Sequence, residues 1–394
     1  MAATNAVARL RSTHPDLELW FDSSPLIYES WRRTIPGPLG PDDLFHMETT
    51  PGGGVTYLPD SLLQGATTNQ PLTLQVITKD PVFWEDWLRA ELRRSPAATS
   101  REAMWRVFIE VAARGADYLR PIAEATGFKR GQICCEVDPR DDTDVEGMVS
   151  QARRIHAARP NIMVKMPGTK EGIEGVRILT EQGIPTNVTL SFTLPQMIAV
   201  GEAAQAGLEA ARKRGTDLRY WRSGAVMMFG RYEDHPVFRA QAKERGIELS
   251  DADLRWAGIA IFRKANRLFR ERGYPSKLMG ASMRLGPTVD GVTRVWHLEK
   301  VAGTNGVLTI FPNILEAFLA VYANEPLPSQ IDDPVPADVL EKLLRIPYFV
   351  EAYDERGIAP EAFSAHPALR ATEASFIEAM EKVEKFAADV MARP

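Results

Sequence analysis

The chain has 394 residues, of which 44% are hydrophobic and 25% are charged, and its formal net charge is −5. This composition is typical of a globular protein and argues against a disordered or fibrous chain. The acidic balance, without any long basic run, also argues against nucleic acid as a partner.

Short apolar runs alternate with amphipathic helical stretches along most of the chain. Strand candidates, in chain order, are 17–21, the region before Thr68, 131–139, 161–167, 183–192, 225–230, 276–282 and 306–311. Eight strands with helices between them are typical of a (β/α)8 TIM barrel and favour it over a doubly wound sheet. We therefore expect an α/β fold with a closed parallel barrel.

Three segments add detail to this barrel. A helix is expected from about Thr143 to Ala158, and Thr143 and Glu146 at its start have the spacing of a capping box. Residues 36–60, between the first two strands, are rich in proline and glycine and predict a long insertion loop. Residues 326–394 predict a helical C-terminal extension packed on a barrel that comprises residues 1–325.

The localisation signals are all negative. No apolar stretch approaches the ~18 residues that a membrane helix needs, and the N-terminal segment lacks the apolar core of a signal peptide. The two cysteines, Cys134 and Cys135, are adjacent and fit a reducing compartment. We expect a cytoplasmic protein that does not contact a membrane.

Lys165 is the most informative single residue. It lies between Val164 and Met166 in an apolar strand, although lysine is among the residue types least often buried. Removal from water disfavours the ammonium form, and a neutral amine can attack a carbonyl to form a Schiff base. The alternative is a lysine at a strand end that reaches solvent or pairs with a carboxylate.

Other polar residues also fall late in the predicted strands, where the active sites of barrels lie. Glu136 and Asp22 are candidates for general acid and base chemistry, although each is alternatively a structural carboxylate. Asn187 and Thr189 stand two residues apart, hence on one face of their strand, where they could hold a water or a substrate hydroxyl.

Several other kinds of site lack support. The three glycines at 52–54 are not followed by a nucleotide-binding pattern, and the histidines and cysteines have no metal-ligand spacing. Neither Ser191 nor Ser223 lies in the context of a hydrolase nucleophile. We expect no metal and no cofactor.

Six segments together resemble the transaldolase family of class I, Schiff-base-forming aldolases. They follow the family's order and are GATTNQPLT (65–73), CEVDPR (135–140), VKMPGTKEGI (164–173), GIPTNVTLSFTLPQ (183–196), MGASMR (279–284) and LTIFPNILEAF (308–318). A chain that matches this series over residues 65–318 is identified as a divergent member of the family.

The resemblance implies a role for each candidate residue. Lys165 would form the Schiff base, and Asp22 would move the proton of the donor's C4 hydroxyl. Glu136 and Thr189 would hold a proton-shuttling water. The residues that would bind the dihydroxyacetone unit and the sugar phosphate are Asn69, Asn187, Arg231, Arg284 and Ser282. The implied reaction transfers dihydroxyacetone from a ketose phosphate to an aldose phosphate, and the family suggests a homodimer.

Three departures bear on the substrate. In the sixth strand, Val226 and Met228 stand where the family has a serine and an aromatic residue before Arg231. The gap from Asp22 to Asn69 is longer than usual, and Gln70 follows Asn69 where a proline is usual. The alternatives are therefore a related aldolase for another sugar, sulfosugar or cyclitol, an aldolase that releases free dihydroxyacetone, and a catalytically silent barrel.

Overall fold

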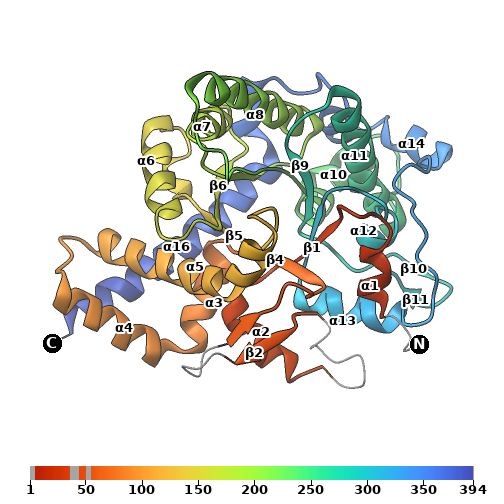
Figure 1. Cartoon of the computed structure of the whole chain (residues 1–394). Helices are drawn as coiled ribbons and strands as arrows, with labels where there is room; N and C mark the ends of the chain where they lie inside the picture. The colour runs from red at the N-terminus through yellow and green to blue at the C-terminus, as the bar shows by residue number, and fades with distance from the viewer. Residues whose placement is uncertain (1–4, 36–43, 50–54, 394) are drawn as a thin grey trace.

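The computed structural model describes residues 5–35, 44–49 and 55–393. Within them, eight parallel strands close into a barrel in the order β1-β12-β9-β8-β7-β6-β5-β4, with helices between them (Figure 1). The strands are β1 Glu18–Phe21, β4 Leu63–Thr67, β5 Gln132–Glu136, β6 Ile162–Pro167, β7 Thr186–Thr189, β8 Ser223–Met228, β9 Lys277–Ala281 and β12 Val307–Ile310. The predicted (β/α)8 TIM barrel is confirmed.

The helices surround the barrel and cover its ends. They are α1 Ala6–Arg11, α2 Pro25–Arg32, α3 Gln70–Lys79, α4 Pro81–Arg94, α5 Ser100–Ala125, α6 Val145–His156, α7 Lys170–Glu181, α8 Leu194–Arg214, α9 Phe229–Glu233, α10 Pro236–Glu244, α11 Asp251–Arg272, α12 Trp296–Glu299, α13 Pro312–Val321, α14 Ala337–Leu343, α15 Pro347–Tyr353 and α16 Pro367–Ala392, with 3-10 turns η2 Pro139–Asp141 and η3 Pro360–Ala365.

The predicted cap of α6 was placed one residue too early. Asp144, not Thr143, is the N-cap, and its carboxylate accepts a hydrogen bond of 3.0 Å from the backbone N–H of Gly147. A Cβ at position 147 would lie 2.3 Å from that carboxylate, so glycine leaves the space that the cap needs. Aspartate caps a helix as effectively as threonine does, and its position decides where the helix begins.

The barrel interior changes in polarity from one end to the other. At the amino-terminal end, buried Glu18 pairs with Arg222 at 2.7 Å and with Lys277 at 2.8 Å. Burial alone would raise the pKa of Glu18, but the two cations outweigh it and the pKa is lowered. In the middle, the side-chain amide of Asn187 contacts the sulfur atoms of Cys134 and Met279 across the barrel. The interior is a packed core that closes the lower end of the barrel.

The insertion between β1 and β4 is more ordered than predicted. It contains an antiparallel hairpin of β2 Met47–Thr49 and β3 Val55–Tyr57, where only a loop was expected. Tyr57 is buried and its ring stacks on that of Phe45 at 4.1 Å, with Tyr28 of α2 edge-on to Phe45 at 4.9 Å. This aromatic packing gives the hairpin a core to rest on. The rest of the expected loop, 36–43 and 50–54, lies outside the described residues.

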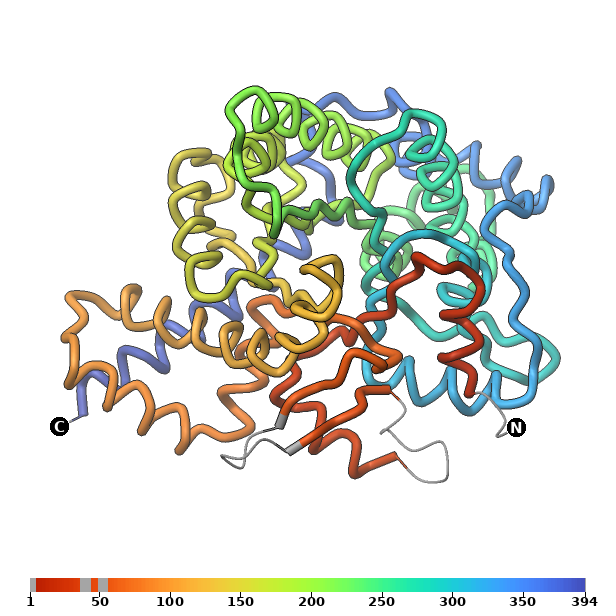
Figure 2. Tube along the Cα trace, viewed as in Figure 1, coloured from red at the N-terminus to blue at the C-terminus, as the bar shows by residue number. Residues whose placement is uncertain are grey.

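The residues after α13 form helices α14, α15 and α16, and the long α16 is the one that concerns the site. It packs against α3, α4, α5 and α9, which follow β4 or β8 along the chain. Figure 1 shows α16 passing behind the barrel strands, and Figure 2 shows the blue C-terminal tube ending beside the orange segments of α4 and α5. The domain division at residue 325 stays a prediction.

A second short hairpin, β10 Thr288–Val289 and β11 Val292–Thr293, follows β9.

Candidate active site

A cavity of about 50 Å³ lies at the carboxyl ends of the barrel strands. It is lined by Asp22, Thr67, Asn69, Lys165, Asn187, Thr189, Val226, Met228, Arg231, Met279, Ala281, Ser282, Thr309, Phe311 and Phe376. Seven of the nine residues predicted from the sequence are among them, and the two exceptions are Glu136 and Arg284. The barrel therefore brings together side chains that are far apart in the sequence.

Lys165 lies in the wall of this cavity and is only 7% exposed. The parallel register pairs its position with Glu136 on β5 and with Asn187 on β7. Adjacent strands are about 4.8 Å apart, so the amine-bearing residue stands between a carboxyl and an amide at the same height in the barrel. A primary amine, an acid and an amide placed together in this way have the functional groups that carbonyl condensation needs.

Glu136 is buried behind the cavity wall. Burial raises its pKa to about 8, against the opposing charges of Lys165 and Arg231. Its Oε2 atom has no hydrogen-bond partner among the residues that the structure describes. At neutral pH this carboxyl is mostly protonated, and it can donate a proton to a group bound beside Lys165.

Asp22 ends the first strand on another side of the same cavity. Burial raises its pKa to about 6, although the charge of Lys165 and a hydrogen bond from the backbone N–H of Ser282 act in the opposite direction. Ser282 itself has a positive φ of 56°, which turns its backbone sharply after β9. At neutral pH Asp22 is mostly a carboxylate, so the two buried acids differ in their charge.

Two asparagines and a threonine complete the polar wall. The side-chain oxygen of Asn69 caps α3 by accepting from Leu72 N–H at 2.9 Å, which fixes the direction of its amide group. The Asn187 side chain packs over Gly224 of β8, where a Cβ would lie 2.2 Å from its Oδ1 atom. Thr189 Oγ1 lies 3.8 Å from the sulfur atom of Met228. The residue types on β8 thus shape the space around the β7 side chains.

The two arginines expected at a phosphate group differ in their surroundings. Arg231 lines the cavity, and burial lowers its pKa, as does the neighbouring charge of Arg284. Arg284 lies outside the cavity wall, where its Nε donates to Asp234 at 2.7 Å. One nitrogen of its guanidinium also donates to the backbone oxygens of Ser282 and Met283 at 3.2 Å. Arg231 is the better placed of the two to meet a ligand.

Some residues of the cavity were not singled out in the sequence. Thr67, Thr309 and Phe311 occupy the ends of β4 and β12, where position alone marks them as candidates. Phe376 comes from α16, and its neighbour Ser375 accepts a hydrogen bond of 3.2 Å from Arg231. Nothing in the amphipathic pattern of α16 distinguishes these two residues from ordinary helix positions.

The residues that the structure describes contain no group of three or more histidine, cysteine, aspartate or glutamate side chains arranged to hold a metal ion. Among the same residues, no helix combines the length and apolar character that a membrane span requires.

Comparisons with known proteins identify the family. The model of the Transaldolase/Fructose-6-phosphate aldolase family matches residues 46–385. The chain is 32% identical to Transaldolase 1 of Streptomyces avermitilis over 58% of this chain and 60% of that protein. It is 26% identical to Transaldolase 2 of the same organism over 84% of this chain and 93% of that protein. It is 30% identical to a transaldolase of Renibacterium salmoninarum over 58% of this chain and 61% of that protein.

The relatives differ in how much of their length is matched. The chain spans about 60% of the first and third of these relatives and nearly the whole of the second. A solved structure of the carboxyl transferase domain of Rhizobium etli pyruvate carboxylase is 13% identical, with a TM-score of 0.26, and the match covers 98% of this chain and 59% of that chain. The family match covers most of the sequence and all eight barrel strands except the first. The chain belongs to the Transaldolase/Fructose-6-phosphate aldolase family.

Proposed function

We propose that this protein is a transaldolase-type class I aldolase that moves a dihydroxyacetone unit from a ketose phosphate to an aldose phosphate. The observation that supports this most is the placement of a buried lysine, Lys165, between Glu136 and Asn187 in a cavity at the barrel mouth. From the family resemblance and the reduced cysteines we further propose that the protein acts in the cytoplasm as a homodimer and needs no cofactor.

The reaction uses the two buried acids in opposite ways. The Lys165 nitrogen attacks the C2 carbonyl carbon of the ketose, and the carbinolamine loses water with a proton from Glu136, relayed by a water on Thr189. The Asp22 carboxylate takes the proton of the C4 hydroxyl as the C3–C4 bond breaks and the aldehyde leaves. The bonding electrons form a three-carbon enamine on Lys165, which attacks the acceptor aldehyde, and hydrolysis then releases the new ketose.

The acids have the protonation states that these roles need. A pKa of about 8 leaves Glu136 mostly protonated at neutral pH, whereas a pKa of about 6 leaves Asp22 mostly ionised. Buried pairs of carboxyl groups whose pKa values are pushed apart are a general sign of an acid and a base in one site. This supports the assignment of Glu136 as the proton donor and Asp22 as the base.

A second candidate keeps the same chemistry but changes the sugar. Val226 and Met228 line the cavity in place of the family's serine and aromatic residue, and Arg284 is held by Asp234. Both features weaken the case for a phosphate group at this end. The second candidate is therefore an aldolase of this type that acts on another sugar, a sulfosugar or a cyclitol.

A transfer assay tests the proposal and separates the candidates. The protein is incubated with erythrose 4-phosphate as acceptor and, in parallel, with fructose 6-phosphate, free fructose or a sulfonated ketose as donor. Formation of the new ketose from fructose 6-phosphate supports the first candidate, and formation only from another donor supports the second. The absence of transfer from all donors, beside an active transaldolase control, would contradict the first candidate, and the second for the sugars and sulfosugars tested.

A further inference from the structure

Helix α16 lies over the mouth of the barrel. It packs against α3, η2 and α9, which follow β4, β5 and β8 at the carboxyl ends of these strands. These are the strand ends around which the cavity forms. A helix from the C-terminal extension therefore covers part of the site where the proposed chemistry takes place.

Phe376 and Ser375 on α16 contact the arginine of the cavity. The ring of Phe376 is 1% exposed and lines the cavity, with the guanidinium carbon of Arg231 5.5 Å from its centre. Ser375 Oγ accepts a hydrogen bond of 3.2 Å from Arg231. The Phe376 ring and the Ser375 hydroxyl thus occupy the space beside Arg231, where the far end of a bound sugar would otherwise lie.

The space that remains is small. At about 50 Å³, the cavity has room for only a few waters, since each needs roughly 10–15 Å³ on the same measure. A three-carbon ketone extends only a short way from Lys165, whereas a six-carbon ketose phosphate must extend to the region of Arg231 and Phe376. The part of the cavity wall formed by Arg231 and Phe376 therefore limits the length of the ligand that the site accommodates.

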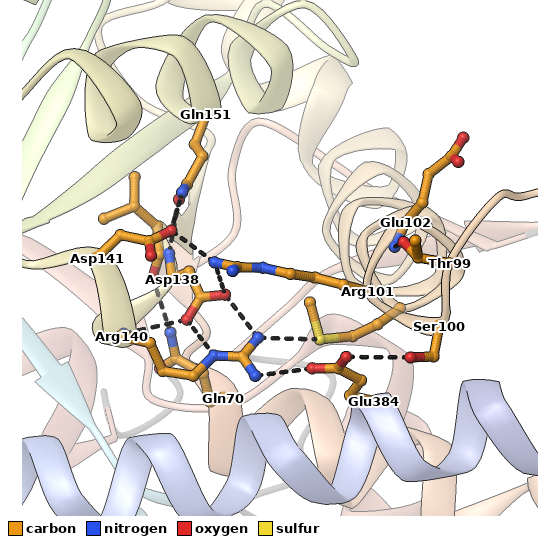
Figure 3. Close-up of polar contacts among 12 residues, drawn as sticks. Gln70, Thr99, Ser100, Arg101, Glu102, Asp138, Arg140, Asp141, Gln151 and Glu384 are labelled. Carbon is orange, nitrogen blue, oxygen red and sulfur yellow. Dashed lines mark hydrogen bonds and ion pairs between the residues drawn. The ribbon is translucent and has the colours of Figure 1, made fainter. Parts of the chain in front are cut away.

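Polar contacts hold α16 in this position. Glu384 of α16 accepts from Arg140 at 2.7 Å and from Ser100 at 3.1 Å. Arg140 also donates hydrogen bonds to both carboxylate oxygens of buried Asp138, with which Arg101 of α5 forms an ion pair at 2.9 Å (Figure 3). Asp138 stands two residues after Glu136, so the same network joins α16 to the end of β5. Phe376 is thus placed by a fixed helix rather than by a loose tail.

We propose that Phe376 is a specificity-determining residue that limits the length of the sugar chain that the site accepts. This inference rests on the proposed Schiff-base chemistry at Lys165. Truncation of the ring opens space next to Arg231 without altering Lys165, Glu136 or Asp22. Affinity for long ketoses then rises, while affinity for the three-carbon ketone stays the same.

The test measures Schiff-base formation with ketones of increasing length. The protein is titrated with dihydroxyacetone, fructose or fructose 6-phosphate, and borohydride then reduces the imine by delivering hydride to its carbon. Peptide mass spectrometry quantifies the secondary amine on Lys165, as the sum of the intact adduct and the three-carbon adduct that C3–C4 cleavage leaves, and the dependence of this sum on concentration gives an apparent Kd for each ketone. The variants are Phe376→Ala, Phe376→Leu and, as a matched control on the same helix outside the cavity wall, Phe386→Ala.

In Phe376→Ala we expect the apparent Kd of both six-carbon ketones to fall by about tenfold or more relative to that of dihydroxyacetone. Phe376→Leu, which keeps more of the packing volume, shifts the ratio less and in the same direction, and decides the matter if the alanine variant does not fold. Phe386→Ala leaves the ratio unchanged.

Two results would overturn the inference and can be told apart. If the Phe376 variants are labelled on Lys165 by dihydroxyacetone but keep the wild-type ratio, the role of Phe376 is wrong and the proposed function stands. If the wild-type protein gives no adduct on Lys165 with any ketone, the proposed function fails and the inference fails with it.

Discussion

The two sides of the cavity differ in how closely they follow the family pattern. The side formed by β5, β6 and β7 carries Glu136, Lys165, Asn187 and Thr189, all of which the family resemblance predicts. The other side, formed by β8, the segment after β9 and α16, carries Val226 and Met228 where the family resemblance predicts a serine and an aromatic residue, and one of its two arginines forms an ion pair with Asp234.

This difference separates the chemistry from the choice of substrate. Condensation and proton transfer need a few groups in fixed positions, so the first side is constrained by the reaction. The second side meets the variable part of the sugar, where changes in volume and polarity alter the substrate without altering the reaction. If the two sides are independent in this way, substitutions on the first side change the rate of the reaction and substitutions on the second side change the choice of sugar.

The largest effect is expected from loss of the amine on the first side. Lys165→Met removes the nucleophile, and we expect the transfer rate to fall on the order of 10⁵-fold or more. Steady-state assays with saturating donor measure the loss. Lys170→Met is the matched control, because Lys170 is exposed on α7 and pairs with Glu361 at 3.0 Å. A Lys165→Met variant with substantial activity would contradict the Schiff-base proposal.

Replacement of the proposed proton donor has the next largest effect. We expect Glu136→Gln to lower kcat by about 10²–10⁴-fold, the usual contribution of general acid catalysis. Stopped-flow measurement of imine formation shows whether the lost step is dehydration of the carbinolamine. A variant that forms the imine at the wild-type rate would show that Glu136 acts elsewhere or not at all.

The same variant has an effect on stability with a definite sign. The pKa of Glu136 is raised from 4.5 to about 8 by burial, so between these values the folded protein keeps a proton that the unfolded chain releases. Stability therefore falls as the pH rises through this window, and Glu136→Gln removes the loss. Denaturant titrations of both proteins at pH 5 and pH 9 should show the variant gaining stability relative to wild type at pH 9.

The acid limb of the pH profile tests the proposed base. With a pKa raised to about 6, Asp22 becomes protonated below that pH, so we expect kcat/KM to fall as the pH drops through about 6. Asp22→Asn should lower the rate by about 10²-fold and abolish this limb. The full pH–rate profiles of both proteins provide the measurement, and an unchanged acid limb in the variant would assign the limb to another group.

The smallest effect concerns the ion pair between Glu384 of α16 and Arg140, which helps to hold α16 on the second side of the cavity. Glu384→Gln weakens the 2.7 Å ion pair with Arg140, which is partly buried, and we expect a loss of about 1 kcal/mol in stability and about 2 °C in Tm. Glu381→Gln, an exposed position on the same helix, is the control. Equal Tm values for the two variants would mean that the ion pair between Glu384 and Arg140 contributes nothing to the stability of the fold.

Most of the barrel and its chemical side could be predicted because the signals are local. Lys165 and Asn187 stand in short apolar runs, and the end of a strand in a barrel is a known place for function. The family resemblance then distinguishes a functional role for these polar residues from a structural one. Such positions are recognisable without any knowledge of which strands are neighbours.

The contribution of α16 could not be predicted in the same way. Phe376 follows an ordinary amphipathic pattern, and its contact with Arg231 joins residues far apart in the chain. The position of Arg284 could not be predicted from the sequence either, because its ion pair with Asp234 depends on how α9 packs against the turn after β9. The β2–β3 hairpin was missed since its strands are only three residues long and are stabilised by aromatic packing against α2.

The most direct test of the proposed chemistry is to map the covalent intermediate. The protein is incubated with fructose 6-phosphate, or with free or sulfonated ketoses, then treated with borohydride and digested for mass spectrometry. We predict a three-carbon adduct on Lys165, left after cleavage of the C3–C4 bond of a donor that the site accepts. A protein that remains unmodified at Lys165 with every donor, while a transaldolase treated alongside is labelled, would contradict the Schiff-base mechanism.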